Sequence, residues 1–146
     1  MILRQKIKHV SVLACKRKID TSTEYLSSLL TSREIRYCQS KRHYAEPTAA
    51  RIAAKLACYA LFNIPTRQKK WMLQIEVSKK NNGQPFLKLS PVLKRKLKLK
   101  INQSLMLSLA HEREIAIAWV ALTDAVPRGS VSPLTPPRRT ASSVSV

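Results

Sequence analysis

Two cations four residues apart, Arg51 and Lys55, are the side chains whose spacing most directly suggests chemistry. They lie in the longest stretch of the chain that is both apolar and compatible with a helix, and helical residues four apart project from the same face. Two like charges on one face repel each other, which fits a site where an anion lies over them. A solvated basic face on a core helix is the other interpretation, and the spacing alone leaves both open.

The residues around this pair predict a central helix. Pro47 suits the first helical turn because its missing N–H needs no partner there, and Glu46 precedes it at the positive end of the helix dipole. Ile52, Leu56 and Tyr59 recur at spacings of three and four, which is typical of a core-facing stripe. The many alanines between them allow neighbouring elements to approach closely. We therefore expect a helix over residues 47–62 with the rest of the chain packed around it.

The composition indicates one basic domain with an anionic partner. A chain of 146 residues is long enough for a single core, and 45% hydrophobic residues argue against general disorder. The formal charge of +19 favours RNA, a phosphate-rich ligand, an acidic protein or an anionic membrane surface. No run approaches the roughly 20 apolar residues of a membrane span, so we expect no integral membrane protein.

The cysteines and the N-terminal residues bear on the compartment. Cys15, Cys38 and Cys58 are an odd number without a CxxC pair, so they indicate free thiols in a reducing compartment and not a disulfide frame or a zinc site. The first 19 residues contain no acid and several cations, which resembles an organelle transit peptide in charge but not in serine content. These features predict a mitochondrial location, with the cytoplasm as the alternative.

Local patterns predict the remaining elements. Capping-box patterns beginning at Thr21 and Thr31 predict two short helices, and Ser90-Pro91 predicts the start of an amphipathic helix over residues 92–100. Asn81-Asn82-Gly83 supplies the residues of a hairpin turn. We expect strands over residues 7–15, 71–77, 85–89, 105–110 and 115–122. Residues 1–9 are then a basic N-terminal extension, residues 10–123 the domain, and residues 124–146, rich in Pro, Ser and Thr, a disordered tail.

Four segments, in order and at similar spacing, resemble the holo-acyl-carrier-protein synthase family of small 4′-phosphopantetheinyl transferases. They span about residues 10–122 and read LTSRE at 30–34, ARIAAKLA at 50–57, IEV at 75–77 with GQP at 83–85, and LSLAHEREIA at 107–116. The second segment is similar to the family's Arg-Phe-Ala-Ala-Lys-Glu-Ala signature. The last is similar to the Ser-His-Thr or Ala-Asp-Glu-Arg hairpin that ends the family's domain.

The resemblance implies an α+β fold in which a small antiparallel sheet wraps around a central helix. It also implies a homotrimer with coenzyme A sites between subunits and an acyl carrier protein as the partner. The family reaction moves the phosphopantetheine arm of coenzyme A onto a carrier-protein serine and releases adenosine 3′,5′-bisphosphate. In the family, Mg²⁺ held by an Asp of the first strand and by the Glu of the signature stabilises the developing charge.

Both of these acids are replaced in this chain. Leu56 occupies the Glu position, the Asp position falls at or near Val12, and no acid precedes Asp20. Because Mg²⁺ is normally bound through one or two carboxylates, the replacements predict impaired catalysis within a retained fold. An active enzyme would need another metal ligand, for which the candidates are Glu34, Glu76 and Glu112.

The resemblance and the charge together nominate three sets of binding residues. The resemblance implies that coenzyme A phosphates contact Arg51, Lys55 and His111, and that the carrier's acidic helix contacts Lys16, Arg17 and Lys18. The charge density of the last helix would suit RNA phosphates at Lys94, Arg95, Lys96, Lys98 and Lys100. For the two lysine-rich sets the alternative is an ordinary solvated surface, and for His111 it is an ordinary turn histidine.

These observations favour a catalytically impaired, transferase-like binding module over an active enzyme. Its partners would be an acyl carrier protein, rRNA or both, as in an organelle ribosome or its assembly. The alternative is an active holo-acyl-carrier-protein synthase that uses coenzyme A and Mg²⁺. A basic ribosomal-type protein with a coincidental resemblance is a third and weaker hypothesis.

Overall fold

The computed structural model describes residues 1–124. The elements along the chain are β1 (Ile2–Ser11), α1 (Val12–Thr21), α2 (Glu24–Leu29), α3 (Ser32–Gln39), α4 (Ala45–Leu61), the 3-10 helix η1 (Lys69–Gln74), β2 (Ile75–Lys79), β3 (Pro85–Leu89), α5 (Pro91–Leu97), β4 (Gln103–His111) and β5 (Ile115–Asp124). The predicted tail, residues 124–146, lies outside the described residues except for Asp124. No helix in residues 1–124 is both long and apolar enough to cross a membrane.

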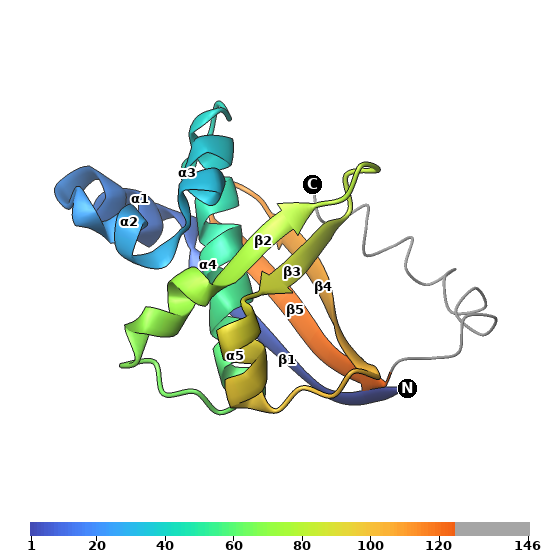
Figure 1. Ribbon diagram of the computed structural model, residues 1–146. Helices are drawn as coiled ribbons and strands as arrows, with labels where there is room; N and C mark the ends of the chain where they lie inside the picture. The colour runs from blue at the N-terminus through green and yellow to red at the C-terminus, as the bar shows by residue number, and fades with distance from the viewer. Residues whose placement is uncertain (125–146) are drawn as a thin grey trace.

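The fold is α+β, as the sequence predicted. An antiparallel sheet with the strand order β1-β5-β4 packs against α4, and the β2-β3 hairpin lies beside β4 (Figure 1). Helices α1, α2 and α3 lie at one end of α4, and α5 lies near its other end (Figure 1). The central helix is therefore enclosed by elements from both halves of the chain.

Small side chains bring α4 close to the sheet. Its buried alanines are Ala45, Ala49, Ala50, Ala53, Ala54 and Ala57. On β5, Ala116 and Ala118 are also fully buried. Because a strand alternates its faces, these two side chains share one side of the sheet, and alanines on both partners permit close packing.

The first strand lies earlier in the sequence than predicted. We expected residues 7–15, but β1 ends at Ser11, whose Oγ accepts a 3.1 Å hydrogen bond from the Ala14 N–H and so caps α1. Residues 1–9, which we expected as an extension outside the domain, form most of β1 and pair with β5. The alternation of apolar residues near Val12 belongs to the first turn of α1 instead.

Three other local predictions differ from the structure. The pattern at Thr21 does not form a capping box: α2 begins at Glu24, and the Thr21 hydroxyl donates to the Arg17 carbonyl at the end of α1. The chain from Trp71 is 3-10 helical, so β2 begins only at Ile75. The last helix ends at Leu97 and not at residue 100.

The remaining local signals are confirmed. Thr31 and Glu34 form the predicted capping box at the start of α3. Gly83 has a φ of 88°, the left-handed conformation that glycine tolerates, in the turn between β2 and β3. Ser90 caps α5 through a 3.1 Å bond from the Leu93 N–H. Each of these depends on residues within a few positions of one another.

The three cysteines are free and buried, as predicted. Burial raises the pKa of the Cys15 thiol to about 11 and that of Cys58 to about 12. Thiolates are the reactive species, so we expect iodoacetamide at pH 8 to leave the native protein unmodified and to alkylate all three cysteines in urea. Intact-mass spectrometry measures both results. Rapid alkylation of the native protein would contradict the buried positions.

Candidate functional site

Lys55 and Glu34 form an ion pair in the protein interior. Lys55 Nζ lies 2.6 Å from Glu34 Oε1, and both side chains are 0% exposed. The same nitrogen donates to the Leu29 carbonyl at 2.7 Å and to the Met72 carbonyl at 2.9 Å. An ammonium has three donors, so all of them are engaged. Lys55 therefore lies on no solvated face, and the predicted contact with coenzyme A phosphates does not fit this geometry.

Glu34 connects this pair to other elements. Its Oε2 accepts a 2.7 Å bond from the Val77 N–H in β2, and its Oε1 accepts one from the Thr31 N–H at 2.9 Å. Desolvation lowers the pKa of Lys55, whereas the Glu34 carboxylate acts in the opposite direction. The network joins α3, α4, η1 and β2, so Lys55 holds these elements together.

Arg51 is also withdrawn from solvent. Its side chain is 3% exposed, one of its terminal nitrogens donates to the Pro47 carbonyl at 3.3 Å, and its guanidinium lies 4.1 Å from the centre of the Tyr37 ring. The Tyr37 hydroxyl accepts a 2.7 Å bond from Lys79 Nζ, and Lys41 Nζ lies 4.8 Å from the same ring. Burial alone would raise the Tyr37 pKa, but these three cations outweigh it and lower that pKa.

His111 lies at the end of β4 and contacts the first turn of α4. Its Nδ1 is 3.1 Å from Glu46 Oε1, and both side chains are 17% exposed. A carboxylate on one ring nitrogen orients the imidazole, so Nε2 is the nitrogen that can meet a ligand. Of the three residues predicted to contact coenzyme A, His111 has the accessibility that this role requires.

The positions expected to hold acids carry none in this structure. Leu56 is half-buried against the core, and Val12 is the buried first residue of α1, so the last residue of the first strand is Ser11. Ser11, like Val12, is not an acid. The position predicted at or near Val12 therefore falls at the junction of β1 and α1, where neither residue is a carboxylate.

Of the three alternative acidic residues, Glu34 and Glu76 have partners within the protein, and Glu112 is exposed. Glu34 accepts hydrogen bonds from Lys55 and from the Val77 N–H, and Glu76 accepts a 2.7 Å bond from the Thr31 hydroxyl. Within residues 1–124, no three His, Cys, Asp or Glu side chains are grouped so that they could hold a metal ion. Within that range, neither Leu56 nor the junction of β1 and α1 offers a carboxylate at the positions where the resemblance implies the Mg²⁺ ligands.

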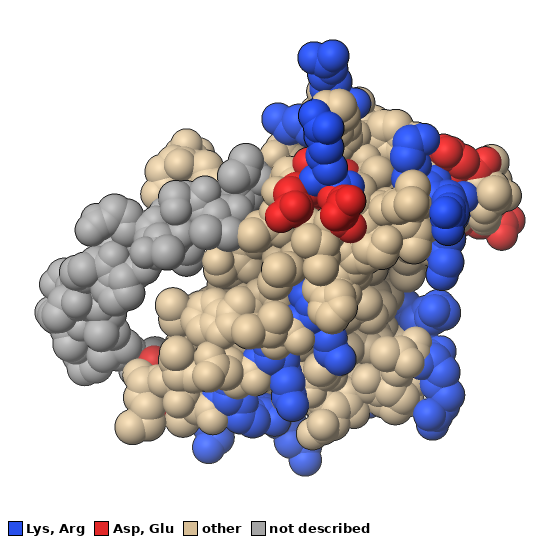
Figure 2. All heavy atoms as spheres, turned by 180° about the vertical axis from the view of Figure 1, so that it is seen from behind, with Lys and Arg blue, Asp and Glu red and all other residues tan. Residues whose placement is uncertain are grey.

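The two basic sets lie on exposed helices. Lys16, Arg17 and Lys18 belong to α1, where Lys16 pairs with Asp20 at 3.0 Å. The set at α5 is exposed and consists of Lys94, Arg95, Lys96, Lys98 and Lys100. Figure 2 shows Lys and Arg spread over much of one side of the molecule, with Asp and Glu confined to a few small areas. The two sets lie near different ends of α4 (Figure 1).

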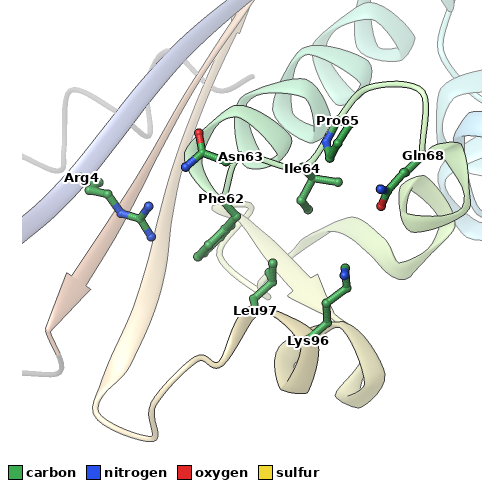
Figure 3. A pocket seen from close by; sticks show the side chains of 8 residues that line it. All are labelled: Arg4, Phe62, Asn63, Ile64, Pro65, Gln68, Lys96 and Leu97. Atoms are coloured by element: carbon green, nitrogen blue, oxygen red, sulfur yellow. The ribbon is translucent and has the colours of Figure 1, made fainter.

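A cavity at the C-terminal end of α4 contains a cation that the sequence did not single out. Arg4 of β1 and Lys96 of α5 both line this space of about 290 Å³ (Figure 3). Arg4 was assigned to the N-terminal extension, and its contact with a helix more than 50 residues away is set by the pairing of β1 with β5. A pattern of neighbouring residues in the sequence cannot predict a contact between residues so far apart.

Comparison with known proteins identifies a consistent set of relatives. The holo-[acyl-carrier-protein] synthase of Trichlorobacter lovleyi is 34% identical over 126 residues, which is 84% of this chain and 98% of that protein. The synthase of Koribacter versatilis is 30% identical over 125 residues, which is 85% of this chain and 100% of that protein. No family model matches the chain.

Solved structures show the same fold. The Helicobacter pylori holo-[acyl-carrier-protein] synthase in complex with coenzyme A is 24% identical and aligns with a TM-score of 0.71 over 82% of this chain and 100% of that chain. The Neisseria meningitidis synthase is 21% identical and aligns with a TM-score of 0.73 over 85% of this chain and 100% of that chain. At these identities the structural likeness concerns the fold alone.

Proposed function

The chain belongs to the holo-[acyl-carrier-protein] synthase family, and from this membership we propose that it moves the 4′-phosphopantetheine arm of coenzyme A onto a serine of an acyl carrier protein. The observation that carries the proposal is sequence similarity at 30% identity or more along the full length of a synthase. The serine oxygen would form a bond to the phosphorus next to the pantetheine arm and lose its proton to water, and adenosine 3′,5′-bisphosphate would leave with the electrons of the broken P–O bond.

Two surfaces of the chain support this assignment. The proposed contact of a coenzyme A phosphate with His111 Nε2 is supported by the partial exposure of this side chain and by Glu46, which lies on the other ring nitrogen. The exposed cations of α1 offer a binding surface to the acidic helix of a carrier protein. Both roles are proposals that rest on the family reaction and on the accessibility of these side chains.

A second candidate function is carrier binding without transfer. It is favoured by the sequence, in which Leu56 and a residue at or near Val12 stand where the resemblance implies the carboxylates of the family reaction. In this case the protein would be a binding module for the acyl carrier protein. Contact with rRNA and a mitochondrial location stay predictions.

A transfer assay distinguishes the two candidates. Purified protein would be incubated with coenzyme A, Mg²⁺ and an apo-acyl carrier protein, and the mass of the carrier would be followed by mass spectrometry. A gain of the phosphopantetheine mass supports the transferase. Carrier binding in a pull-down without any mass gain at high protein concentration supports the binding module instead.

The carrier surface on α1 can be tested by charge reversal. Arg17→Glu should weaken binding of the acyl carrier protein by roughly tenfold, because two unit charges change at an exposed contact with an acidic helix. Surface plasmon resonance at several salt concentrations measures the loss. Lys88→Glu on β3 is a matched control, since Lys88 is exposed and lies outside α1. Equal losses in both variants would indicate only a general charge effect.

The outward face of the sheet supports a homotrimer of the kind that the family resemblance implies. Ile7, Met106 and Ile117 are 63%, 43% and 39% exposed, and the register of the strands places them on the same side. We expect light scattering to give a trimer for the natural chain and a monomer for Ile7→Lys. Ile101→Lys is the control, because Ile101 is fully exposed outside the sheet. A monomeric natural chain would contradict this proposal.

A further inference from the structure

The 3-10 helix η1 and the helix α5 belong to two stretches of the chain that are strongly basic. Residues 67–73 and 91–101 contain eight Lys or Arg and no Asp or Glu. The two helices contact each other, and α5 lies near the end of α4 that is opposite to His111 (Figure 1). None of these residues belongs to the surfaces proposed for coenzyme A or for the carrier protein, so their partner is a separate question.

On η1, a cation and an apolar side chain share the outward side. A 3-10 helix has three residues per turn, so side chains three positions apart eclipse each other. Lys70 and Leu73 are three apart and both exposed, Leu73 by 44%. Trp71 and Met72, which lie between them in the sequence, are buried. Leu73 is therefore held in solvent beside a cation and not against the core.

The helix α5 repeats this combination. Val92, Arg95 and Lys96 are three and four positions apart, so they share one face of the helix. All three are exposed, Val92 by 53%, whereas the neighbouring Leu93 is completely buried. Ser90 Oγ accepts a bond from the Leu93 N–H and so fixes the first turn in this orientation. The outward face of α5 thus carries one aliphatic side chain and two cations.

The Trp71 ring joins the two outward faces. Lys70 Nζ lies 5.0 Å from the centre of this ring, and Lys96 Nζ lies 5.4 Å from the same centre. Because both cations lie beside one indole, the exposed faces of η1 and α5 adjoin. Within residues 1–124, none of the cations on these faces forms an ion pair with a carboxylate. We name this the η1–α5 surface and define it as Lys70, Leu73, Val92, Arg95 and Lys96.

The chemistry of the η1–α5 surface fits a lipid bilayer better than a nucleic acid. Surfaces that bind single-stranded RNA combine cations with aromatic rings on which the bases stack. The Trp71 indole is only 9% exposed, and Leu73 and Val92 have no ring. At an anionic membrane, cations attract the lipid headgroups and neighbouring aliphatic side chains enter the boundary between headgroups and acyl chains. Exposed aliphatic side chains beside unpaired cations match this second environment.

We propose that the η1–α5 surface binds the anionic surface of a lipid bilayer. Lys70, Arg95 and Lys96 contact the headgroups, while Leu73 and Val92 enter the interface. The association is peripheral and reversible, because two short apolar side chains supply little buried area. Its electrostatic part weakens as salt is added. The proposal goes beyond the transfer reaction and does not depend on it.

The first variant of the full chain removes the apolar side chains of the surface. It is Leu73→Ser with Val92→Ser. The matched control is Leu3→Ser with Leu13→Ser, since these leucines are 40% and 55% exposed and lie outside the surface. Loss of two exposed aliphatic side chains is thus common to both proteins, and only their place differs.

The second variant removes cations of the surface. It is Lys70→Ala with Lys96→Ala. Lys8→Ala with Lys88→Ala is its control, because these two lysines are exposed on β1 and β3 and the net charge changes equally. Circular dichroism verifies that all four variants are folded.

The probes are vesicles of phosphatidylcholine alone, vesicles that also contain about one third phosphatidylserine, and a fluorescein-labelled single-stranded RNA. Cosedimentation measures vesicle binding and anisotropy measures RNA binding. We expect the natural chain to sediment with the anionic vesicles and not with the neutral ones. Each surface variant should bind the anionic vesicles about tenfold more weakly, and each control should stay within about twofold of the natural chain.

The RNA probe distinguishes a membrane from a nucleic acid as the partner. The apolar variant and its control should bind RNA equally. If the cation variant loses RNA binding while the apolar variant binds anionic vesicles as its control does, the surface belongs to a nucleic acid and the proposal is overturned. A natural chain that does not sediment with the anionic vesicles would overturn it as well.

Discussion

Lys55→Met should lower the free energy of unfolding by roughly 3–5 kcal/mol, because it leaves the Glu34 carboxylate buried without its counter-charge. The methionine fills similar space, so the loss reports on charge and hydrogen bonding and not on a cavity. The carbonyls of Leu29 and Met72 also lose their donor. Urea unfolding followed by circular dichroism measures the change.

A double-mutant cycle is the control for this prediction. Glu34→Leu alone should also destabilise the protein, since it leaves the Lys55 ammonium unpaired. The combination of Lys55→Met with Glu34→Leu should recover part of either loss, because no buried charge remains. Effects of the two substitutions that simply add would show that the pair does not act as one unit, in conflict with the 2.6 Å contact.

Introducing a carboxylate at each of the two positions proposed for the metal ligands should increase transfer by on the order of a hundredfold when Mg²⁺ is present, since a bound metal supplies several kcal/mol of charge stabilisation and each 1.4 kcal/mol is tenfold in rate. The variant is Ser11→Asp with Leu56→Glu. Aspartate can still cap α1, as Ser11 does, whereas an acid at Val12 would be buried. The rate is measured by the mass of the carrier protein.

A second readout separates metal binding from catalysis. Mg²⁺ should raise the unfolding temperature of the Ser11→Asp, Leu56→Glu variant, because a ligand that binds only the folded state stabilises it. The matched control is Ser11→Asn with Leu56→Gln, which has similar shape without the charges. If Mg²⁺ stabilises both variants equally and transfer does not change, these two positions do not form the metal site of this chain.

Local sequence signals determined a substantial part of this protein. The capping box of Thr31 and Glu34, the turn at Gly83 and the serine cap at Ser90 are formed by residues close in sequence, and each was predicted correctly. The four family-like segments, which need only order and spacing, led to the family that the relatives confirm. The caps and the turn depend on contacts between residues only a few positions apart in the sequence.

Tertiary structure alone decided the environment of the charged residues. The spacing of Arg51 and Lys55 predicts that they share a helix face. Burial of that face follows from packing, which also pairs Lys55 with Glu34, a residue 21 positions earlier in the sequence. Arg4 lines the cavity at the end of α4 because β1, the first strand of the sequence, pairs with β5, the last described strand. Periodicity describes the direction of a side chain, whereas the element that it meets is selected by the packing of the whole chain.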